Sequence, residues 1–435
     1  MITYHFPPDG AVGGLRWSGI SKYLARRGWE IHVVTAAAGG NGVPVPGVQI
    51  HHCPRARTLN DRYNAGVQRR RAARPGLVVS ASTLPTAAVP IRLHDRIRRD
   101  LGVLLAFPDV GRGWIWRAAR AARSLMRKQR FDAVVSSGPP HSAHLAGVLA
   151  CVGRQIPHLV DMRDPWASMF ELTGAQTISD SSWVRALLVR LEKFTFQRAH
   201  RIVTNTPEFM SILGHAYPEL PVSCISNGID PDRVPPPAPK YPGLAISYAG
   251  TLYLSRDLGP VVRGMKQFVE QHPEAMSAIR LVVAGSMNEG LRVRFWKEVD
   301  AAGLHDAVEM RGRISGDEAL DMINRSQLTI VLAQDQPTQI PAKLYECVAM
   351  HVPTLVIGES NSAAAREARR IGAVVVEPSD IAGIRDVLAL SWAEPSRAVR
   401  AAAPIGYDEI AGRVDELLRR ELTGASTRGS TNFGN

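Results

Sequence analysis

Residues 2–36, ITYHFPPDGAVGGLRWSGISKYLARRGWEIHVVTA, decide the fold because they contain a complete strand–helix–strand unit. Residues 2–6 have the character of a short buried strand, and a glycine-rich turn follows at 7–16. Residues 17–28 have the apolar spacing of an amphipathic helix that closes at Gly28, and residues 30–36 are again strand-like. Strands joined by a helix in this way run parallel in one sheet. The stretch therefore predicts the start of a parallel α/β domain.

The same alternation recurs along the chain and predicts two domains. Apolar runs in FDAVVSSGPP, IPHLVDMRDP and AHRIVTNTP each end in turn residues, as buried parallel strands do. A turn at Asn227-Gly228 and prolines at 235–242 then separate a second series, with helices expected at 257–272, 289–302, 316–325, 342–350 and 362–371. We predict the α/β class: two Rossmann-like, doubly wound domains facing an interdomain cleft.

The predicted boundaries follow from this alternation. The first domain covers residues 1–225 and the second covers 240–405. A helix at 406–422 is expected to pack back toward the first domain, and the polar residues 423–435 read as a disordered tail. Residues 54–100 contain few apolar side chains and many arginines, so we interpret them as a long loop or irregular insertion.

Composition narrows the class of protein. A chain of 435 residues is too long for one ordinary core. The four cysteines match no disulfide or zinc spacing, so they are expected to be ordinary thiols. We see no signal-peptide pattern and no apolar run long enough to span a bilayer. The expected location is the cytoplasm, with possible peripheral contact at the inner face of the cell membrane.

Charge is distributed unevenly between the two halves. Residues 1–200 carry 28 Lys and Arg against 12 Asp and Glu, and the remainder carries 24 against 28. Such an asymmetry indicates an anionic partner for the first half, or simply an arginine-rich solvated surface. Nucleic acid is not expected, because the arginine runs lack interleaved aromatic platforms.

The stretch PAKLYECVAM, residues 341–350, predicts an anion site at the start of a helix. The positive end of the helix dipole repels Lys343, unless an anion lies between them. Arg256 follows another predicted strand and the turn at Gly250, again close to a helix start. Arg256 and Lys343 are therefore candidates to clamp a diphosphate. An ionised Glu346 could accept hydrogen bonds from two ribose hydroxyls. An i,i+3 pair of Lys343 with Glu346 is the alternative.

These motifs, taken in order, resemble glycosyltransferases of GT-B fold and family 4 type. The second half contributes NGID at 227–230, YAGTLYLSRD at 248–257 and the lysine–glutamate helix; the first half contributes residues 109–147 and LVDMRDPW at 159–166. The resemblance covers most of residues 1–420. It implies a UDP- or GDP-sugar donor on the second domain, an acceptor on the first, retention of anomeric configuration and no essential metal or other cofactor.

The resemblance also assigns site residues. Glu346 is similar to the glutamate that holds ribose, and Gly13 and Gly14 are similar to a glycine loop that approaches the donor phosphates. Many relatives carry a second glutamate where this chain has Thr338, for which Gln336 or Gln339 could substitute, and a basic residue where it has Thr251. The full set of predicted donor-binding residues is Gly13, Gly14, Arg16, Gly250, Thr251, Gly285, Arg311, Thr338, Gln339, Leu344, Tyr345 and Glu346.

The predicted catalytic set adds residues of the first half. Arg163 and Asp164 end a strand where many relatives carry a histidine near the transferred sugar, although an ion-paired loop anchor is the alternative. His141 follows another strand and could face the cleft as an acid, base or acceptor contact. The catalytic candidates are Arg256, Lys343, Arg163, Asp164 and His141. The DPD at 230–232 is interpreted as a turn whose aspartates form local hydrogen bonds, so no metal ligand is predicted.

The expected function is a retaining glycosyltransferase that acts on a hydroxyl acceptor. The acceptor could be a sugar or glycan, a lipid-linked molecule or a small-molecule aglycone. The alternatives are a GT-B nucleotide-sugar epimerase or phosphorylase-like transferase, and a catalytically inactive basic scaffold. The basic helix expected at 113–130 carries Trp114 and Trp116, which either pack on the core or meet an anionic membrane.

Overall fold

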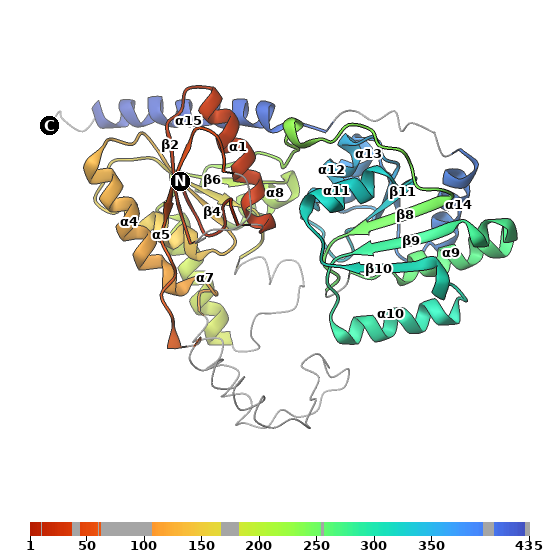
Figure 1. Cartoon of the computed structure of the whole chain (residues 1–435). Coiled ribbons are helices and arrows are strands. Elements are labelled where there is room, and N and C mark those ends of the chain that lie inside the picture. The colour runs from red at the N-terminus through yellow and green to blue at the C-terminus, as the bar shows by residue number, and fades with distance from the viewer. Residues whose placement is uncertain are drawn as a thin grey trace. The chain divides into compact units, whose positions relative to one another are not determined.

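The structure is a computed structural model of the 435-residue chain, and it describes residues 1–9, 11–36, 44–59, 61, 107–166, 182–253, 256–394 and 404–430. The described residues form two compact units (Figure 1). The N-terminal unit contains the residues up to Asn227 and those from Tyr407 onward. The C-terminal unit contains Gly228–Gly406. Most of the insertion expected at 54–100 lies outside the described residues.

A parallel seven-stranded sheet forms the centre of the N-terminal unit. Its order is β3 (Val48–His52), β2 (Ile31–Thr35), β1 (Ile2–Thr3), β4 (Val134–Gly138), β5 (His158–Met162), β6 (Arg201–Thr204) and β7 (Val222–Cys224). Its α-helices are α1 (Leu15–Arg26), α4 (Ile115–Lys128), α5 (Ser142–Cys151), α7 (Ser182–Phe196), α8 (Pro207–Ala216) and α15 (Tyr407–Ser430). Short 3₁₀ turns lie at η1 (Val12–Gly14) and η2 (Arg112–Trp114).

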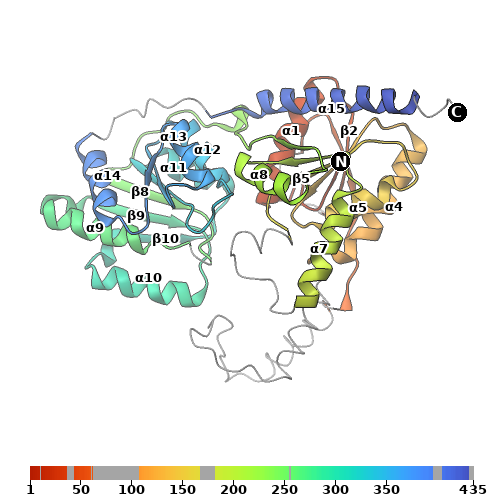
Figure 2. The ribbon, with the colours of Figure 1, turned by 180° about the vertical axis from the view of Figure 1, so that it is seen from behind.

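Helices α4, α5, α7 and α8 cover one face of this sheet (Figure 2). Trp114 and alanines of α4 and α5 pack on β1, β2 and β4, while α7 and α8 bury Phe196 and Phe209 over β5 and β6. Helix α1 lies on the other face, and the long helix α15 packs against it.

A parallel six-stranded sheet forms the centre of the C-terminal unit. Its order is β10 (Val308–Gly312), β9 (Ile279–Ala284), β8 (Leu244–Ala249), β11 (Leu328–Leu332), β12 (Thr354–Ile357) and β13 (Val374–Val376). Its α-helices are α9 (Gly259–Gln271), α10 (Glu289–Ala301), α11 (Gly316–Asn324), α12 (Ala342–Ala349), α13 (Ala363–Arg370) and α14 (Ile381–Ala393). The 3₁₀ turns are η3 (Pro231–Arg233), η4 (Pro273–Ser277) and η5 (His305–Ala307).

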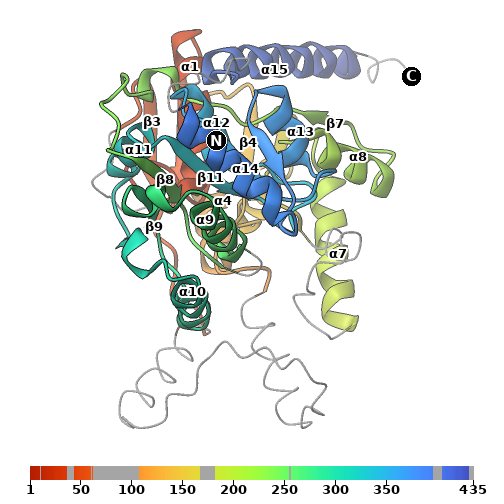
Figure 3. The same ribbon diagram turned by 90° about the vertical axis from the view of Figure 1, so that its right-hand side faces the viewer.

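Two cores sandwich this second sheet. Helices α9 and α14, which lie side by side in Figure 3, bury one face together with α10. Helices α11, α12 and α13 bury the opposite face through Val282, Val331 and Val356. The predicted class of two Rossmann-like, doubly wound sheets is therefore confirmed.

The strand order identifies where a ligand would bind in each unit. It reverses between β1 and β4 in the first sheet and between β8 and β11 in the second. Ligands of open parallel sheets bind beyond the carboxyl ends of the strands at such reversal points. The loops after β1, β4 and β5, and those after β8, β9 and β11, are therefore the places to examine.

Two elements differ in length from the sequence expectation. β1 ends at Thr3, not at residue 6, and the chain then turns, with Asp9 N donating to Phe6 O at 3.2 Å. Helix α15 continues past Leu422 to Ser430. The Thr423 hydroxyl donates to the Arg419 and Arg420 carbonyls, so this polar side chain forms its hydrogen bonds within the helix. Residues 431–435 lie outside the described residues.

Candidate functional site

Three glycine-containing loops are joined by backbone hydrogen bonds at one edge of the C-terminal sheet. Gly250 N donates to Ala284 O at 2.9 Å, and Gly285 N donates to Gly312 O at 2.7 Å. Gly285 has φ +142°, and a Cβ built there would lie 1.9 Å from the Gly250 carbonyl oxygen. Only glycine fits this position, so the loops after β8 and β9 stay in close contact.

Arg256 reaches from the loop after β8 to the loop after β11. Its Nη2 donates to Gln336 Oε1 at 3.2 Å, and its guanidinium lies over the Tyr253 ring, 4.8 Å from the centroid. Its Nε is buried, and within the described chain no group accepts a hydrogen bond from it. The guanidinium therefore keeps donor capacity for an anion.

Gln334 holds the Arg256 loop in place, a role that sequence analysis missed. Its side chain accepts from Asp257 N at 2.9 Å and donates to Asp257 O at 3.0 Å. Asp257 in turn accepts from Gly259 N at the start of α9. The sequence signal for this role is an amide side chain directly after the apolar run LTIVLA, residues 328–333.

Lys343 and Glu346 lie in the first turns of α12 and contact each other. Lys343 Nζ donates to Glu346 Oε2 at 2.5 Å, with 34% and 16% of the two side chains exposed. The alternative i,i+3 pair is thus present. Both groups still reach solvent, so a phosphate could take the lysine and a ribose could take the carboxylate.

The loop before α12 is conformationally strained. Asp335 has φ +54°, which is uncommon for a residue other than glycine. Its amide donates to both oxygens of Glu359, at 3.1 Å each, and this ties the loop after β11 to the loop after β12. Strain of this kind tends to occur at functional sites.

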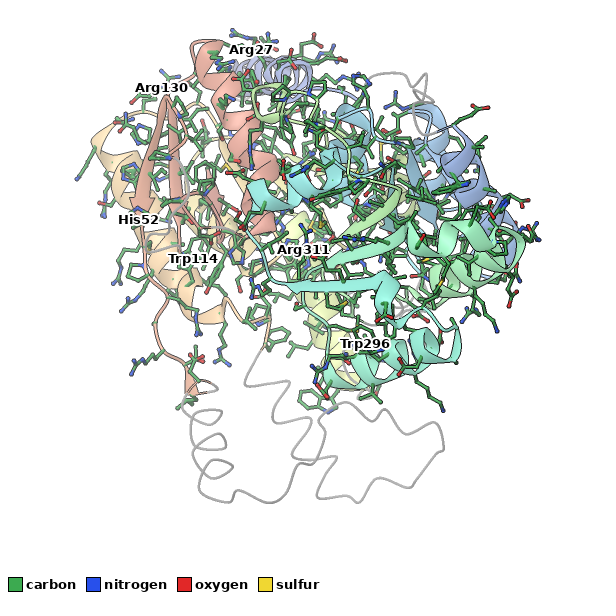
Figure 4. The ribbon with its side chains drawn as sticks, turned by 45° about the vertical axis from the view of Figure 1, so that its right-hand side comes forward. Arg27, His52, Trp114, Arg130, Trp296 and Arg311 are labelled. Atoms are coloured by element: carbon green, nitrogen blue, oxygen red, sulfur yellow. The ribbon has the colours of Figure 1, made fainter. Side chains whose placement is uncertain are left out.

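Several predicted donor residues occupy other environments. Leu344 and Tyr345 are fully buried in the core beneath α12, so only their backbones could meet a ligand. Thr338 is also buried, and Gln339 is half-buried. Arg311, labelled on β10 in Figure 4, pairs with Glu309 at 2.7 Å, and this pairing raises its pKa.

Thr251 lies beside the second glycine loop. Its hydroxyl accepts from Ser286 Oγ at 3.4 Å, and its side chain is exposed. Thr251 is therefore open to solvent. In the resemblance described above, many relatives carry a basic residue at this position.

In the N-terminal unit, Arg163 ties three loops together. Its Nε donates to Gly138 O at 2.9 Å, its Nη2 to Pro139 O at 2.9 Å and its Nη1 to Gly13 O at 2.7 Å. Burial lowers the pKa of this guanidinium. Arg163 thus anchors these loops through carbonyl groups, whereas the alternative prediction is an ion-paired anchor. Half-buried Asp164 follows it directly. A Cβ at Gly14 would lie 3.1 Å from Phe6 Cα, so the glycine loop packs closely.

Arg16 is buried, whereas a residue that contacts the nucleotide-sugar donor would be expected to reach solvent. Only 3% of it is exposed, and its guanidinium donates to Asp161, to Asn227 Oδ1 and to the carbonyls of Ile225 and Ser226. Trp17 Nε1 and Ser137 Oγ also donate to Asp161, at 2.7 Å each. This geometry favours a positioning role for Arg16 over the predicted contact with donor phosphate.

His141 is a buried, neutral histidine. Its ring stacks on Trp166 with centroids 4.8 Å apart, and burial lowers its pKa to about 3. The ring is therefore uncharged near neutral pH and is a poor proton donor there, which leaves acceptor contact as its predicted role.

His5 and Asp9 form a pair that the sequence analysis did not single out. His5 Nδ1 lies 2.9 Å from Asp9 Oδ2, and a Cβ at Gly13 would lie 3.3 Å from His5 Cδ2. The pair therefore borders the glycine loop at the carboxyl edge of β1. In the sequence, the only indication of this pair is a histidine four residues before an aspartate in HFPPD. That spacing does not predict a contact unless the geometry of the loop is known.

The described residues contain no cluster of three His, Cys, Asp or Glu side chains suited to a metal. Asp230 of the DPD accepts from Asp232 N at 3.2 Å and begins η3, which is turn chemistry as expected. Over the same parts of the chain, no helix is both long and apolar enough to cross a membrane.

Comparison with known proteins identifies the class. Sucrose-phosphate synthase from Thermosynechococcus elongatus shares 14% identity and a TM-score of 0.60, over 94% of this chain and 93% of that one. An α,α-trehalose-phosphate synthase (UDP-forming) from Burkholderia xenovorans, in complex with glucose-6-phosphate, shares 12% identity and a TM-score of 0.63, over 96% and 98%. Anabaena HepE in complex with UDP and glucose shares 11% identity and a TM-score of 0.59, over 96% and 98%. The fold is GT-B.

A family profile matches part of the sequence. The profile of Glycosyltransferase Family 4 matches residues 77–233. No curated protein sequence matches the chain. Together the profile and the fold support a glycosyltransferase, and the resemblance to family 4 enzymes of GT-B fold is confirmed.

Proposed function

We propose that the protein is a retaining glycosyltransferase that moves a sugar from a UDP- or GDP-sugar to a hydroxyl acceptor. The observation that carries this proposal is the edge of the C-terminal sheet. There the loops after β8 and β9 are in backbone contact, and Arg256 spans to the loop that leads into α12. Such an edge combines backbone amides, cations and a helix start, which together suit a diphosphate.

The donor would bind through three side chains. The diphosphate would take up the free donor capacity of Arg256 and would replace Glu346 as the partner of Lys343. Glu346, released from the lysine, would accept hydrogen bonds from the ribose hydroxyls. Gly250 and Gly285 would hold the loops after β8 and β9 together beside the diphosphate, because neither carries a side chain.

Chemistry would depend on stabilising the leaving group. The bond between the anomeric carbon and the phosphate oxygen breaks, and its electron pair stays on the diphosphate. The acceptor oxygen bonds to the anomeric carbon from the same face, and its proton passes to that phosphate. Arg256 and Lys343 would stabilise the charge that develops on the diphosphate. No metal ion takes part in this scheme.

The acceptor would meet the N-terminal unit at the edge that Arg163 organises. Gly13, Asp164 and the His5–Asp9 pair lie around that edge. The acceptor could be a sugar, a lipid-linked molecule or a small-molecule aglycone. A sugar is supported by the complexes of similar fold that contain glucose-6-phosphate or glucose.

An inactive scaffold of the same fold is the second candidate. It is favoured by Thr338, which is 4% exposed and stands where many relatives carry a sugar-binding glutamate. Release of nucleoside diphosphate from a panel of UDP- and GDP-sugars, with candidate acceptors, separates the two. Turnover with an α-linked product from an α-linked donor supports our proposal. An inverted product refutes retention, and a nucleotide that binds without turnover favours the scaffold.

Metal independence has its own test. Activity should be unchanged by EDTA, because the DPD at 230–232 is engaged in a turn. Loss of activity on chelation that magnesium or manganese restores would refute this part of the proposal.

We also propose that the protein is cytoplasmic and contacts anionic membrane through α4. Trp116, Arg120, Arg123 and Arg127 follow one another at helical spacing, and Trp116 is 74% exposed while Trp114 is buried. A basic helix face with an exposed tryptophan suits an anionic lipid surface.

Co-sedimentation with anionic liposomes tests this contact. Binding should fade with salt and weaken when Arg117, Arg120 and Arg123 are changed to glutamate. The triple variant Arg190→Glu, Arg280→Glu and Lys297→Glu carries the same charge change on exposed positions elsewhere and serves as the control. Absence of binding at low salt would leave a soluble acceptor as the better hypothesis.

A further inference from the structure

A pocket of about 560 Å³ lies at the far end of α4 from Trp114, where Figure 4 labels Arg130. Four cations line it: Arg127, Lys128, Arg130 and Arg154. Phe131 and Ile156 contribute apolar surface. The pocket is therefore both strongly basic and large enough for more than a single ion.

The pocket lies at the opposite edge of the sheet from the glycine loop. Its residues directly precede β4 and β5, whereas Gly138 and Arg163 follow the same strands. Five strand residues span roughly 16 Å. The pocket thus belongs neither to the acceptor edge nor to the donor loops of the C-terminal unit.

The four cations are not neutralised by the protein. Within the described chain, none of them forms an ion pair with a carboxylate. Arg154 Nη1 donates only weakly to Met126 O, at 3.4 Å, and its buried Nε has no acceptor among the described residues. Gln129, which also lines the pocket, donates to the Glu30 carboxylate at 3.4 Å, and His32 pairs with the same carboxylate.

Helix stabilisation explains only part of this cluster. Arg127 and Lys128 occupy the last turn of α4, where cations offset the negative end of the dipole. Arg130 lies beyond the helix end, and Arg154 comes from the turn after α5, so neither is needed for that purpose. Four uncompensated cations around one pocket create a local positive potential that attracts an anion.

We propose that this pocket binds a phosphate ester. Arginine guanidinium groups hold phosphate oxygens in bidentate fashion, and lysine adds a point charge. The volume leaves room for a polyol or sugar attached to the phosphate, and the apolar residues offer a surface for its carbons. A lipid headgroup and a soluble phosphate ester share this chemistry. The inference does not depend on the proposed glycosyl transfer.

Two probes distinguish the sources. Glycerol 3-phosphate, followed by calorimetry, represents a soluble ester, and phosphatidylglycerol vesicles, followed by co-sedimentation, represent a headgroup. Binding of either probe that weakens about tenfold or more in Arg130→Glu plus Arg154→Glu supports the pocket. Binding of both probes indicates a site open to soluble esters, while binding of vesicles alone identifies the headgroup.

Matched variants separate the pocket from general charge and from the α4 face. Arg280→Glu plus Lys297→Glu changes charge equally in the C-terminal unit and should leave both probes bound as before. Arg117→Glu plus Arg120→Glu should weaken vesicle binding but not glycerol 3-phosphate binding. Since Arg154 is half-buried, Lys128→Gln plus Arg130→Gln provides a milder second test. The proposal is overturned if neither probe binds, or if pocket and control variants behave alike.

Discussion

The two units share a fold but use their arginines differently. In the N-terminal unit, Arg16 and Arg163 give their donors to carboxylate, amide and carbonyl groups of the protein itself. In the C-terminal unit, Arg256 retains a buried Nε with no acceptor within the described chain, and Lys343 is paired only with a neighbour in its own helix. A cation at the carboxyl edge of a strand is therefore not by itself a ligand contact. The partners of its donors decide between scaffold and site.

The largest expected effect tests the scaffold side of this comparison. Arg16→Ala should lower the free energy of unfolding of the N-terminal unit by about 3–5 kcal/mol, because it leaves the buried Asp161 carboxylate without its cation. Chemical denaturation measures this change. Arg120→Ala, at an exposed position of α4, should alter stability little, and equal effects of the two changes would contradict the comparison.

The next effect tests the site side. Arg256→Ala or Lys343→Ala should each lower kcat by about 10²–10³-fold, because both groups are proposed to act on charge that develops in the transition state. Steady-state kinetics with a saturating nucleotide-sugar donor measures this loss. A raised KM with unchanged kcat would mean uniform binding of donor and transition state, and the proposed mechanism would then be wrong.

Glu346 should affect affinity more than stability. Glu346→Ala should weaken binding of free nucleoside diphosphate by about 1.5–3 kcal/mol, because charge-assisted hydrogen bonds to the ribose are lost. Calorimetry on the folded variant measures this difference, with Glu274→Ala at an exposed site as the control. Unchanged affinity would limit Glu346 to its pair with Lys343.

Buried histidines should make the stability of the N-terminal unit depend on pH. Burial lowers the pKa values of His141 and His158 to about 3, from an ordinary 6.5. Between these values the unfolded chain binds protons that the folded chain does not, so stability is full above pH 6.5 and falls as pH decreases toward 3. Near pH 5 the loss should be about 2 kcal/mol for each histidine.

Denaturation at pH 7 and pH 5 measures this dependence. His141→Gln should flatten the slope, whereas His305→Gln, at an exposed histidine paired with Asp300, should not. A slope that His141→Gln leaves unchanged would show that another group is responsible.

Local patterns carried most of the fold prediction. The helices expected at 289–302 and 316–325 are α10 and α11, within one residue at each end, because their caps Asn288 and Ser315 and their apolar spacing are both local signals. The site predictions for Gly285 and Arg256 are drawn from a strand–turn–helix pattern that is also local.

Long-range contacts carried the parts that sequence reasoning missed. Arg16 meets the carbonyl of Ser226 across 210 residues, and no pattern near Arg16 predicts that its donors are already taken. Trp114 and Trp116 are two residues apart, yet one is buried and donates to Cys53 O while the other is exposed. Residues two apart on a helix point in nearly opposite directions, but the sequence does not tell which of the two tryptophans meets the core.

The chain leaves the N-terminal unit after Asn227 and returns to it at Tyr407, so the C-terminal unit is an insertion within the other. Its two ends meet, because Ile229 N donates to Ile405 O at 3.1 Å and Ile229 pairs with Gly406 in a parallel bridge. The gene can therefore be cut at these two points. A short flexible peptide in place of residues 228–406 should leave the outer unit intact, and the excised piece should bind nucleoside diphosphate alone. Binding of the nucleotide and binding of the acceptor could then be measured separately, one on each isolated unit.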